Sequence, residues 1–121
     1  MQVGVIHFPV CNINKSLEFY RDKLGLKCTK LLTELKNPWA ELDGGGVIIG
    51  IQEVKEKFEK ELPPWRGAMI SFEVNDIENT KSHLEKIGVN FLTDIQEFGE
   101  VKVAKFEDPD GNPLEIHEWI K

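Results

Sequence analysis

The residues best suited to chemistry lie near the end of the chain, on one predicted strand. Glu115, His117 and Trp119 alternate with two aliphatic residues, so an extended backbone would bring all three to the same face. A carboxylate and an imidazole two residues apart can transfer protons or bind a metal ion. With an indole beside them, they indicate a wall that faces a ligand rather than a solvated edge.

A turn leads into this strand. In the segment Asp108-Pro-Asp-Gly-Asn112, Pro109 fixes its own φ and Gly111 can adopt the left-handed conformation. We expect Asp110 to hydrogen-bond back to the backbone. Residues 101–106 and 113–120 on either side read as strands, which predicts a hairpin.

Composition excludes several classes of function. The 121 residues predict one domain, and a formal charge of −6 without a basic cluster argues against nucleic-acid binding. No apolar run is long enough to cross a membrane. Two cysteines, Cys11 and Cys28, and no signal peptide predict a cytoplasmic protein without a disulfide framework.

The order of elements occurs twice. The first half predicts strands at residues 2–10, 26–33, 39–42 and 47–52 and a helix at 12–24. The apolar stripe of this helix comprises Ile13, Leu17, Tyr20 and Leu24. The second half predicts a helix at 75–87 and strands at 67–74, 91–94, 101–106 and 114–119. Asn12 begins the first helix and Gly25 follows it, as is typical of helix caps.

This repetition predicts an α+β fold built from two βαβββ modules. Module one spans residues 1–53, a connector spans 54–66, and module two spans 67–121. Each module alone would expose one apolar face of its sheet, so the two copies must pair. We expect curved mixed sheets around a cup.

Two motifs resemble one known family. The segment Ser16-Leu-Glu-Phe-Tyr-Arg-Asp-Lys-Leu-Gly25 and the ending Asp108-Pro-Asp-Gly-Asn-Pro-Leu-Glu-Ile116, on a duplicated βαβββ plan, are similar to the vicinal oxygen chelate superfamily. That superfamily includes glyoxalases, bleomycin resistance proteins and dioxygenases. The resemblance implies a cup that holds a small molecule, and it implies a homodimer. It does not fix the reaction.

The resemblance also implies four metal-ligand positions. They fall on Val5, Ile48, Met69 and Glu115, so only Glu115 can ligate a hard divalent ion. We therefore assign no cofactor from the sequence and expect no ordinary four-ligand metal site. The alternative is a displaced divalent-metal site built from His7, His117 and either Glu115 or Glu73.

The remaining candidates would line the cup. His7, Ser71 and Glu73 should face the same cavity as Glu115 and His117, above an apolar floor of Val5, Ile48 and Met69. Trp39 and Gln52 are further candidates for the ligand wall.

Two functions stay open. The first is glyoxalase-like lyase or isomerase chemistry on a small oxygenated substrate. There Glu115 would act as ligand or base, and His7 or His117 would carry protons. The second is metal-independent sequestration of a small molecule, as in bleomycin resistance proteins.

Overall fold

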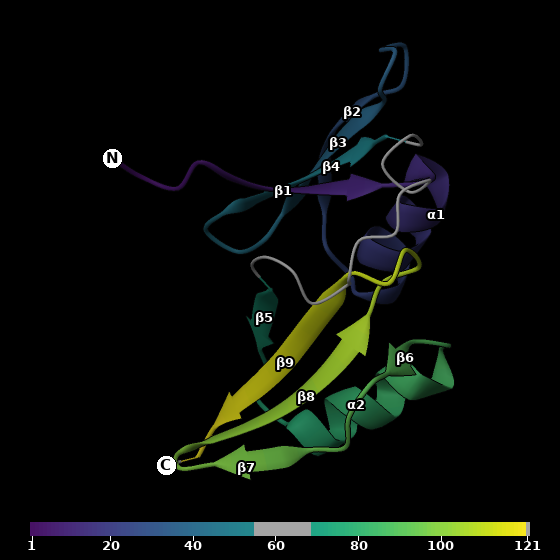
Figure 1. Ribbon diagram of the computed structural model, residues 1–121. Helices are drawn as coiled ribbons and strands as arrows, with labels where there is room; N and C mark the ends of the chain where they lie inside the picture. The colour runs from purple at the N-terminus through teal and green to yellow at the C-terminus, as the bar shows by residue number, and fades with distance from the viewer. Residues whose placement is uncertain (55–68, 121) are drawn as a thin grey trace. The chain divides into compact units, whose positions relative to one another are not determined.

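The computed structural model describes residues 1–54 and 69–120. The chain divides into two compact units, Met1–Leu62 and Pro63–Lys121, and each is described by itself (Figure 1). The predicted connector, residues 54–66, lies outside the described residues except for Val54. No helix in the described part of the chain has both the length and the apolar character needed to span a membrane.

Unit one is a four-stranded sheet covered by one helical segment. Its elements are β1 (Val5–Val10), α1 (Ile13–Leu17), η1 (Glu18–Lys23), β2 (Cys28–Leu32), β3 (Trp39–Asp43) and β4 (Ile48–Glu53). The strand order is β1-β4-β3-β2, with β1 parallel to β4 and the other neighbours antiparallel. This is the predicted βαβββ order.

Unit two repeats that order. Its elements are β5 (Ile70–Glu73), α2 (Ile77–Lys86), β6 (Asn90–Phe91), β7 (Gln96–Phe98), β8 (Val101–Glu107) and β9 (Pro113–Trp119). The strands run β5-β9-β8-β6, β7 also pairs with β8, and β5 is parallel to β9. The α+β fold with mixed sheets is confirmed, and one predicted strand, 91–94, is replaced by the two short strands β6 and β7.

The first predicted helix differs from expectation in its second half. Asn12 caps it as predicted, because its side chain accepts a hydrogen bond from the Lys15 N–H at 3.0 Å. After Leu17 the helix widens into a π-helical turn. The neighbouring side chains Phe19 and Tyr20 are both buried in this turn.

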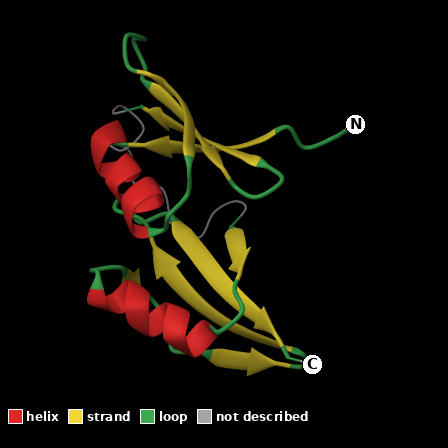
Figure 2. Ribbon diagram, turned by 180° about the vertical axis from the view of Figure 1, so that it is seen from behind, coloured by secondary structure: helices red, strands yellow, loops and turns green. Residues whose placement is uncertain are grey.

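Strand alternation sorts the side chains into two faces, and Figure 2 shows each helical segment lying on one side of its own sheet. The helix-covered faces hold the core. In unit one it includes Phe8, Val10, Ala40, Leu42, Ile49 and Ile51, and in unit two Ala104, Phe106, Leu114 and Ile116. The other face of each sheet, called here the helix-free face, carries the predicted site residues.

Candidate functional site

A hydrogen-bonded chain crosses the helix-free face of unit two. Ser71 on β5 is the pairing partner of Glu115 on β9, and its hydroxyl donates to Glu115 Oε1 at 2.7 Å. The same hydroxyl oxygen lies 2.6 Å from Nδ1 of His117. The parallel pairing of β5 with β9 places one short side chain between two longer ones. Three of the predicted site residues are therefore brought together within unit two.

The number of available protons fixes the direction of these hydrogen bonds. An ionised Glu115 can only accept, and a serine hydroxyl has a single proton to donate. When Ser71 gives that proton to Glu115, Nδ1 of His117 must carry a hydrogen and donate it to the Ser71 oxygen. The Nε2 atom of a neutral His117 then bears the lone pair, which suits a general base.

Two further side chains, Glu73 and Trp119, lie beside the His117 end of this hydrogen-bonded chain. Oε1 of Glu73 lies 3.8 Å from Nε2 of His117 and accepts the indole N–H of Trp119 at 3.0 Å. The Trp119 ring stands edge-on to the His117 ring, with centroids 5.6 Å apart. This end of the hydrogen-bonded chain therefore places a carboxylate and an indole beside the His117 ring.

Unit one carries a different set of side chains on its helix-free face. The Trp39 ring meets the His7 ring at a centroid distance of 5.2 Å and an angle of 71°. The Trp39 indole N–H donates to Oε2 of Glu41 at 2.9 Å, and that oxygen lies 3.8 Å from the Lys30 ammonium. Trp39 also faces Gly50, because a Cβ built on Gly50 would lie 2.2 Å from its Cη2 atom.

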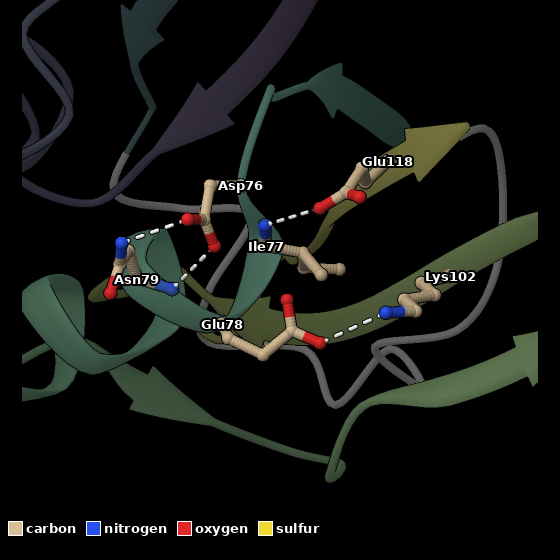
Figure 3. A network of polar contacts seen from close by, with 6 residues as sticks. All are labelled: Asp76, Ile77, Glu78, Asn79, Lys102 and Glu118. Carbon is tan, nitrogen blue, oxygen red and sulfur yellow. Dashed lines mark hydrogen bonds and ion pairs between the residues drawn. The ribbon is translucent and has the colours of Figure 1, made fainter. Parts of the chain in front are cut away.

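An acidic cluster at the start of α2 resembles a metal site by composition. Among the residues that the structure describes, only Asp76, Glu78 and Glu118 bring three potential ligand atoms within 4.8 Å of one another. Figure 3 shows that each of these three carboxylates already has a partner. Asp76 accepts from Asn79 and Glu118 accepts from the Ile77 N–H. We therefore interpret the cluster as a helix cap.

The third member of this cluster forms an ion pair. Glu78 accepts from Lys102 at 3.0 Å, which lowers the pKa of Glu78. The same contact raises the pKa of Lys102.

Comparison with known proteins decides the family. Residues 2–116 match the Glyoxalase/Bleomycin resistance protein/Dioxygenase superfamily. The chain belongs to this superfamily. It is 33% identical to the metallothiol transferase FosB of Staphylococcus haemolyticus (strain JCSC1435), over 95% of this chain and 81% of that protein. It is 30% identical to the uncharacterized protein YraH of Bacillus subtilis (strain 168), over 99% of this chain and 100% of that one.

A solved structure gives the same fold at lower identity. TnmS3, an antibiotic binding protein from Streptomyces sp. CB03234, superposes with a TM-score of 0.74 at 18% identity. The alignment covers 98% of this chain and 96% of TnmS3. This likeness shows the superfamily fold and carries no further conclusion about chemistry.

Strand pairing corrects the internal alignment of the two modules. His7 pairs with Gly50 in unit one as Ser71 pairs with Glu115 in unit two, three residues before Val10 and Val74 respectively. The counterpart of Glu115 is therefore Gly50 and not Ile48. The glycines of the two hairpin turns do not correspond, because residues 44–47 separate β3 from β4, whereas residues 108–112 separate β8 from β9.

The donor set does not fit the four-ligand metal site that the superfamily implies. Val5 and Met69 stand at the positions expected for histidines, and Gly50 offers no side chain at all. Glu115 is the one hard ligand, and it already accepts from Ser71. A single carboxylate cannot hold a divalent ion against water.

The predicted apolar floor is exposed in the structure. Val5, Ile48 and Met69 are 41%, 40% and 37% exposed, which is high for such side chains. Gln52 pairs with Trp39 between β4 and β3. His7 lies in unit one and His117 lies in unit two. A cup shared by both units therefore stays a prediction, and so does a displaced metal site that uses both histidines.

Two polar residues near the site were missed from the sequence. Lys105 on β8 is the pairing partner of Glu115, and Glu41 on β3 holds the Trp39 indole. Alternation along Val101, Val103 and Lys105 could have assigned Lys105 to the same face as Glu115. In the turn, the buried Asp108 accepts the backbone N–H groups of Asp110 and Asn112, a role that the sequence did not indicate. A hydrogen bond from the Asp110 side chain back to the backbone stays a prediction.

Proposed function

We propose that the protein takes a small oxygenated molecule at the helix-free face of unit two and transfers a proton to or from it without a four-ligand metal site. One observation carries this proposal. The Ser71 hydroxyl joins the Glu115 carboxylate to the His117 ring through contacts of 2.7 and 2.6 Å. That chain is a proton-transfer device of the lyase or isomerase kind.

His117 is the base in this proposal. Its Nε2 takes a proton from a carbon next to a substrate carbonyl, which leaves an enolate and an imidazolium. The Nδ1–H of the imidazolium donates to Ser71, whose hydroxyl donates to Glu115, so the negative charge of Glu115 stabilises the new positive charge. Return of the same proton to a neighbouring atom completes an isomerisation. His7 as a second proton carrier stays a prediction.

The relatives support a small-molecule function but leave the metal in question. The relative from Staphylococcus haemolyticus is by name a metallothiol transferase. This chain has Val5 and Met69 where the resemblance places histidines. We therefore propose chemistry by its own side chains rather than by a bound metal ion.

A second candidate function is sequestration without reaction. The exposed apolar residues Val5, Ile48 and Met69 favour it, because a binding protein needs an apolar surface more than a base. In this candidate Ser71 and Glu73 of unit two orient the ligand by hydrogen bonds, and Gln52 as part of the ligand wall stays a prediction. TnmS3, an antibiotic binding protein, has the same fold, so the fold is compatible with this role.

Solvent deuterium exchange separates the two candidates. Chelator-treated protein in D₂O is mixed with glycolaldehyde, dihydroxyacetone and 2-oxobutyrate, and NMR measures both deuterium at the carbon and shifts of the His117 ring. Exchange that falls at least about tenfold in Glu115→Gln supports proton transfer. The matched control is Glu34→Gln, an exposed carboxylate of unit one. Binding without exchange favours sequestration, and neither signal contradicts both candidates.

Two further properties belong to this proposal. We propose a homodimer, which sedimentation velocity at micromolar concentration tests, and a monomer at that concentration would contradict it. A cytoplasmic location stays a prediction of the cysteine content.

A further inference from the structure

We infer that Glu73 is the charged end of a surface site for a small organic cation, whose ammonium group binds this carboxylate and whose alkyl chain lies along a row of apolar side chains. The site adjoins His117 on the helix-free face of unit two. The inference rests on the proposed binding of a small molecule at this face, but not on proton transfer. It adds a preference for positively charged molecules.

The carboxylate of Glu73 is held in one orientation and is still open to a ligand. Its Oε1 atom accepts the indole N–H of Trp119 at 3.0 Å. Within residues 1–54 and 69–120, its Oε2 atom accepts no hydrogen bond, and the side chain is 66% exposed. Because one hydrogen bond already orients this carboxylate, little conformational entropy is lost when an ammonium group binds its second oxygen.

The charges near Glu73 favour a cation. Among the described residues, its only ion-pair partner is His117, with 3.8 Å between Oε1 and Nε2. A neutral imidazole leaves the negative charge of Glu73 uncompensated. Lys105 lies on the same face, but it is the strand partner of Glu115, whereas Glu73 pairs with His117. The positive side chain therefore lies beside the other carboxylate, and a ligand can supply the charge that Glu73 lacks.

An apolar row begins next to this carboxylate. Phe98, Val101 and Trp119 are cross-strand partners on β7, β8 and β9, so their side chains share the helix-free face. Phe98 is 60% exposed and Trp119 is 55% exposed. Large apolar side chains that are exposed side by side are typical of binding surfaces. Since Trp119 holds Glu73, the row has a negative charge at its β9 end.

The size of the row selects a small molecule rather than a protein. Neighbouring strands lie about 4.8 Å apart, so three residues in register span about 10 Å, which matches a short alkyl chain. A stable protein interface buries about 800 Å² on each partner, which three side chains do not supply. The occupant that fits is an alkylammonium ion, with its charge at Glu73 and its chain over Trp119, Val101 and Phe98.

The test compares probes that differ in charge but share a chain. Hexylammonium, the neutral hexanol and the anionic hexanoate are titrated at about pH 8, where an ordinary imidazole is neutral. NMR follows the three tryptophan indole N–H signals, and Trp119→Phe assigns the signal of Trp119. We expect a saturable shift of that signal with hexylammonium, binding of hexanol about tenfold weaker, and no saturation with hexanoate. Methylammonium, which lacks the chain, should also bind about tenfold more weakly than hexylammonium.

Variants separate the charge from the apolar row. Glu73→Gln should reduce hexylammonium binding to the level of hexanol, while the glutamine oxygen can still accept the Trp119 N–H. Phe98→Ala should weaken binding of hexylammonium severalfold and leave that of methylammonium unchanged. The matched control is Glu97→Gln, which removes an exposed carboxylate next to Phe98 that points to the opposite face of the sheet. This control should bind hexylammonium as the parent does.

Three results would overturn the inference. They are equal binding of hexylammonium and hexanoate, equal binding of hexylammonium by Glu73→Gln and the parent, or no saturable shift of the Trp119 signal. Deuterium exchange into dihydroxyacetone without hexylammonium binding would contradict the cation site and leave the proposed proton transfer intact. Hexylammonium binding that depends on Glu73, without deuterium exchange, would support the cation site and contradict proton transfer.

Discussion

The two units share one strand order and differ on the face that their helices leave uncovered. In unit one that face presents an indole over Gly50, with His7 at its edge. In unit two the equivalent position presents Glu115 bonded to Ser71. One scaffold thus carries an aromatic surface in its first copy and a hydrogen-bonded polar chain in its second.

The difference shows which residues a duplicated fold must keep. The strand residues that face the helices are aliphatic or aromatic in both units, because they form the core. Residues one position along each strand point away from the core and can change without disturbing the topology. Function therefore follows the helix-free faces.

The largest difference should appear at the two hairpin turns. The buried Asp108 accepts three hydrogen bonds from Asp110 and Asn112, whereas the exposed Asp43 accepts one from the Gly45 N–H. Asp108→Ala leaves three part-buried donors of Asp110 and Asn112 without this acceptor, so we expect it to lower the free energy of unfolding by roughly 2 kcal/mol. Asp43→Ala should cost less than about 1 kcal/mol. Urea denaturation at constant m-value measures both, and equal costs would contradict the comparison.

The next effect concerns the equivalent positions Gly50 and Glu115. Gly50→Ala forces a methyl group into the Trp39 ring, and we expect it to lower the free energy of unfolding by about 2 kcal/mol. Glu115→Ala should cost less than about 1 kcal/mol, because a partly exposed carboxylate has solvent as an alternative partner. Urea denaturation is again the measurement, and near-UV circular dichroism reports the displaced indole. A smaller cost at Gly50 than at Glu115 would show that the indole is not tightly placed.

Substitution of Ser71 should change the rate of deuterium exchange and leave the free energy of unfolding almost unchanged. Ser71→Ala removes the hydroxyl between Glu115 and His117, so deuterium exchange should slow about tenfold while the urea midpoint stays unchanged. Ser71→Thr keeps a hydroxyl and should recover most of the rate. Unchanged exchange in Ser71→Ala would mean that His117 works without Glu115.

The smallest effect concerns the exposed ion pairs. Glu78 and Lys102 join α2 to β8, while Arg21 and Asp22 are sequence neighbours that can pair in the unfolded chain as well. The pKa of Glu78 is lowered by Lys102, so the pair stabilises the fold above the unfolded pKa of Glu78 and loses this effect as pH falls. Glu78→Gln should slightly reduce the loss of unfolding free energy as the pH falls, which urea denaturation at a series of acid pH values measures. Asp22→Asn should leave it unchanged, and added salt should abolish the difference.

Local patterns predicted the elements and their faces. The period-two alternation of Leu114 and Ile116 with Glu115 and His117 was enough to assign each side chain to its face. The side chain of Asn12 accepts the expected capping hydrogen bond. These features depend on residues within one turn or one strand, which a sequence shows directly.

Features that depend on partners distant in sequence were not predictable. The Ser71 contacts cross 44 and 46 residues, and they require the register between β5 and β9. The match of Gly50 to Trp39 likewise depends on which residues face one another across β3 and β4. The π-helical turn at Glu18–Lys23 was likewise not predicted, because the apolar stripe of the segment fits a regular helix.

The most direct test of the account is the state of the His117 ring in solution. Two-bond ¹H–¹⁵N NMR on chelator-treated protein distinguishes the two neutral tautomers, and addition of one equivalent of zinc tests for a metal site. The account predicts that Nδ1 carries the hydrogen, that Ser71→Ala removes this preference, and that zinc leaves the ring signals unchanged. A hydrogen on Nε2 with a free Nδ1, or a stoichiometric zinc shift that Glu115→Gln abolishes, would contradict a metal-independent proton chain.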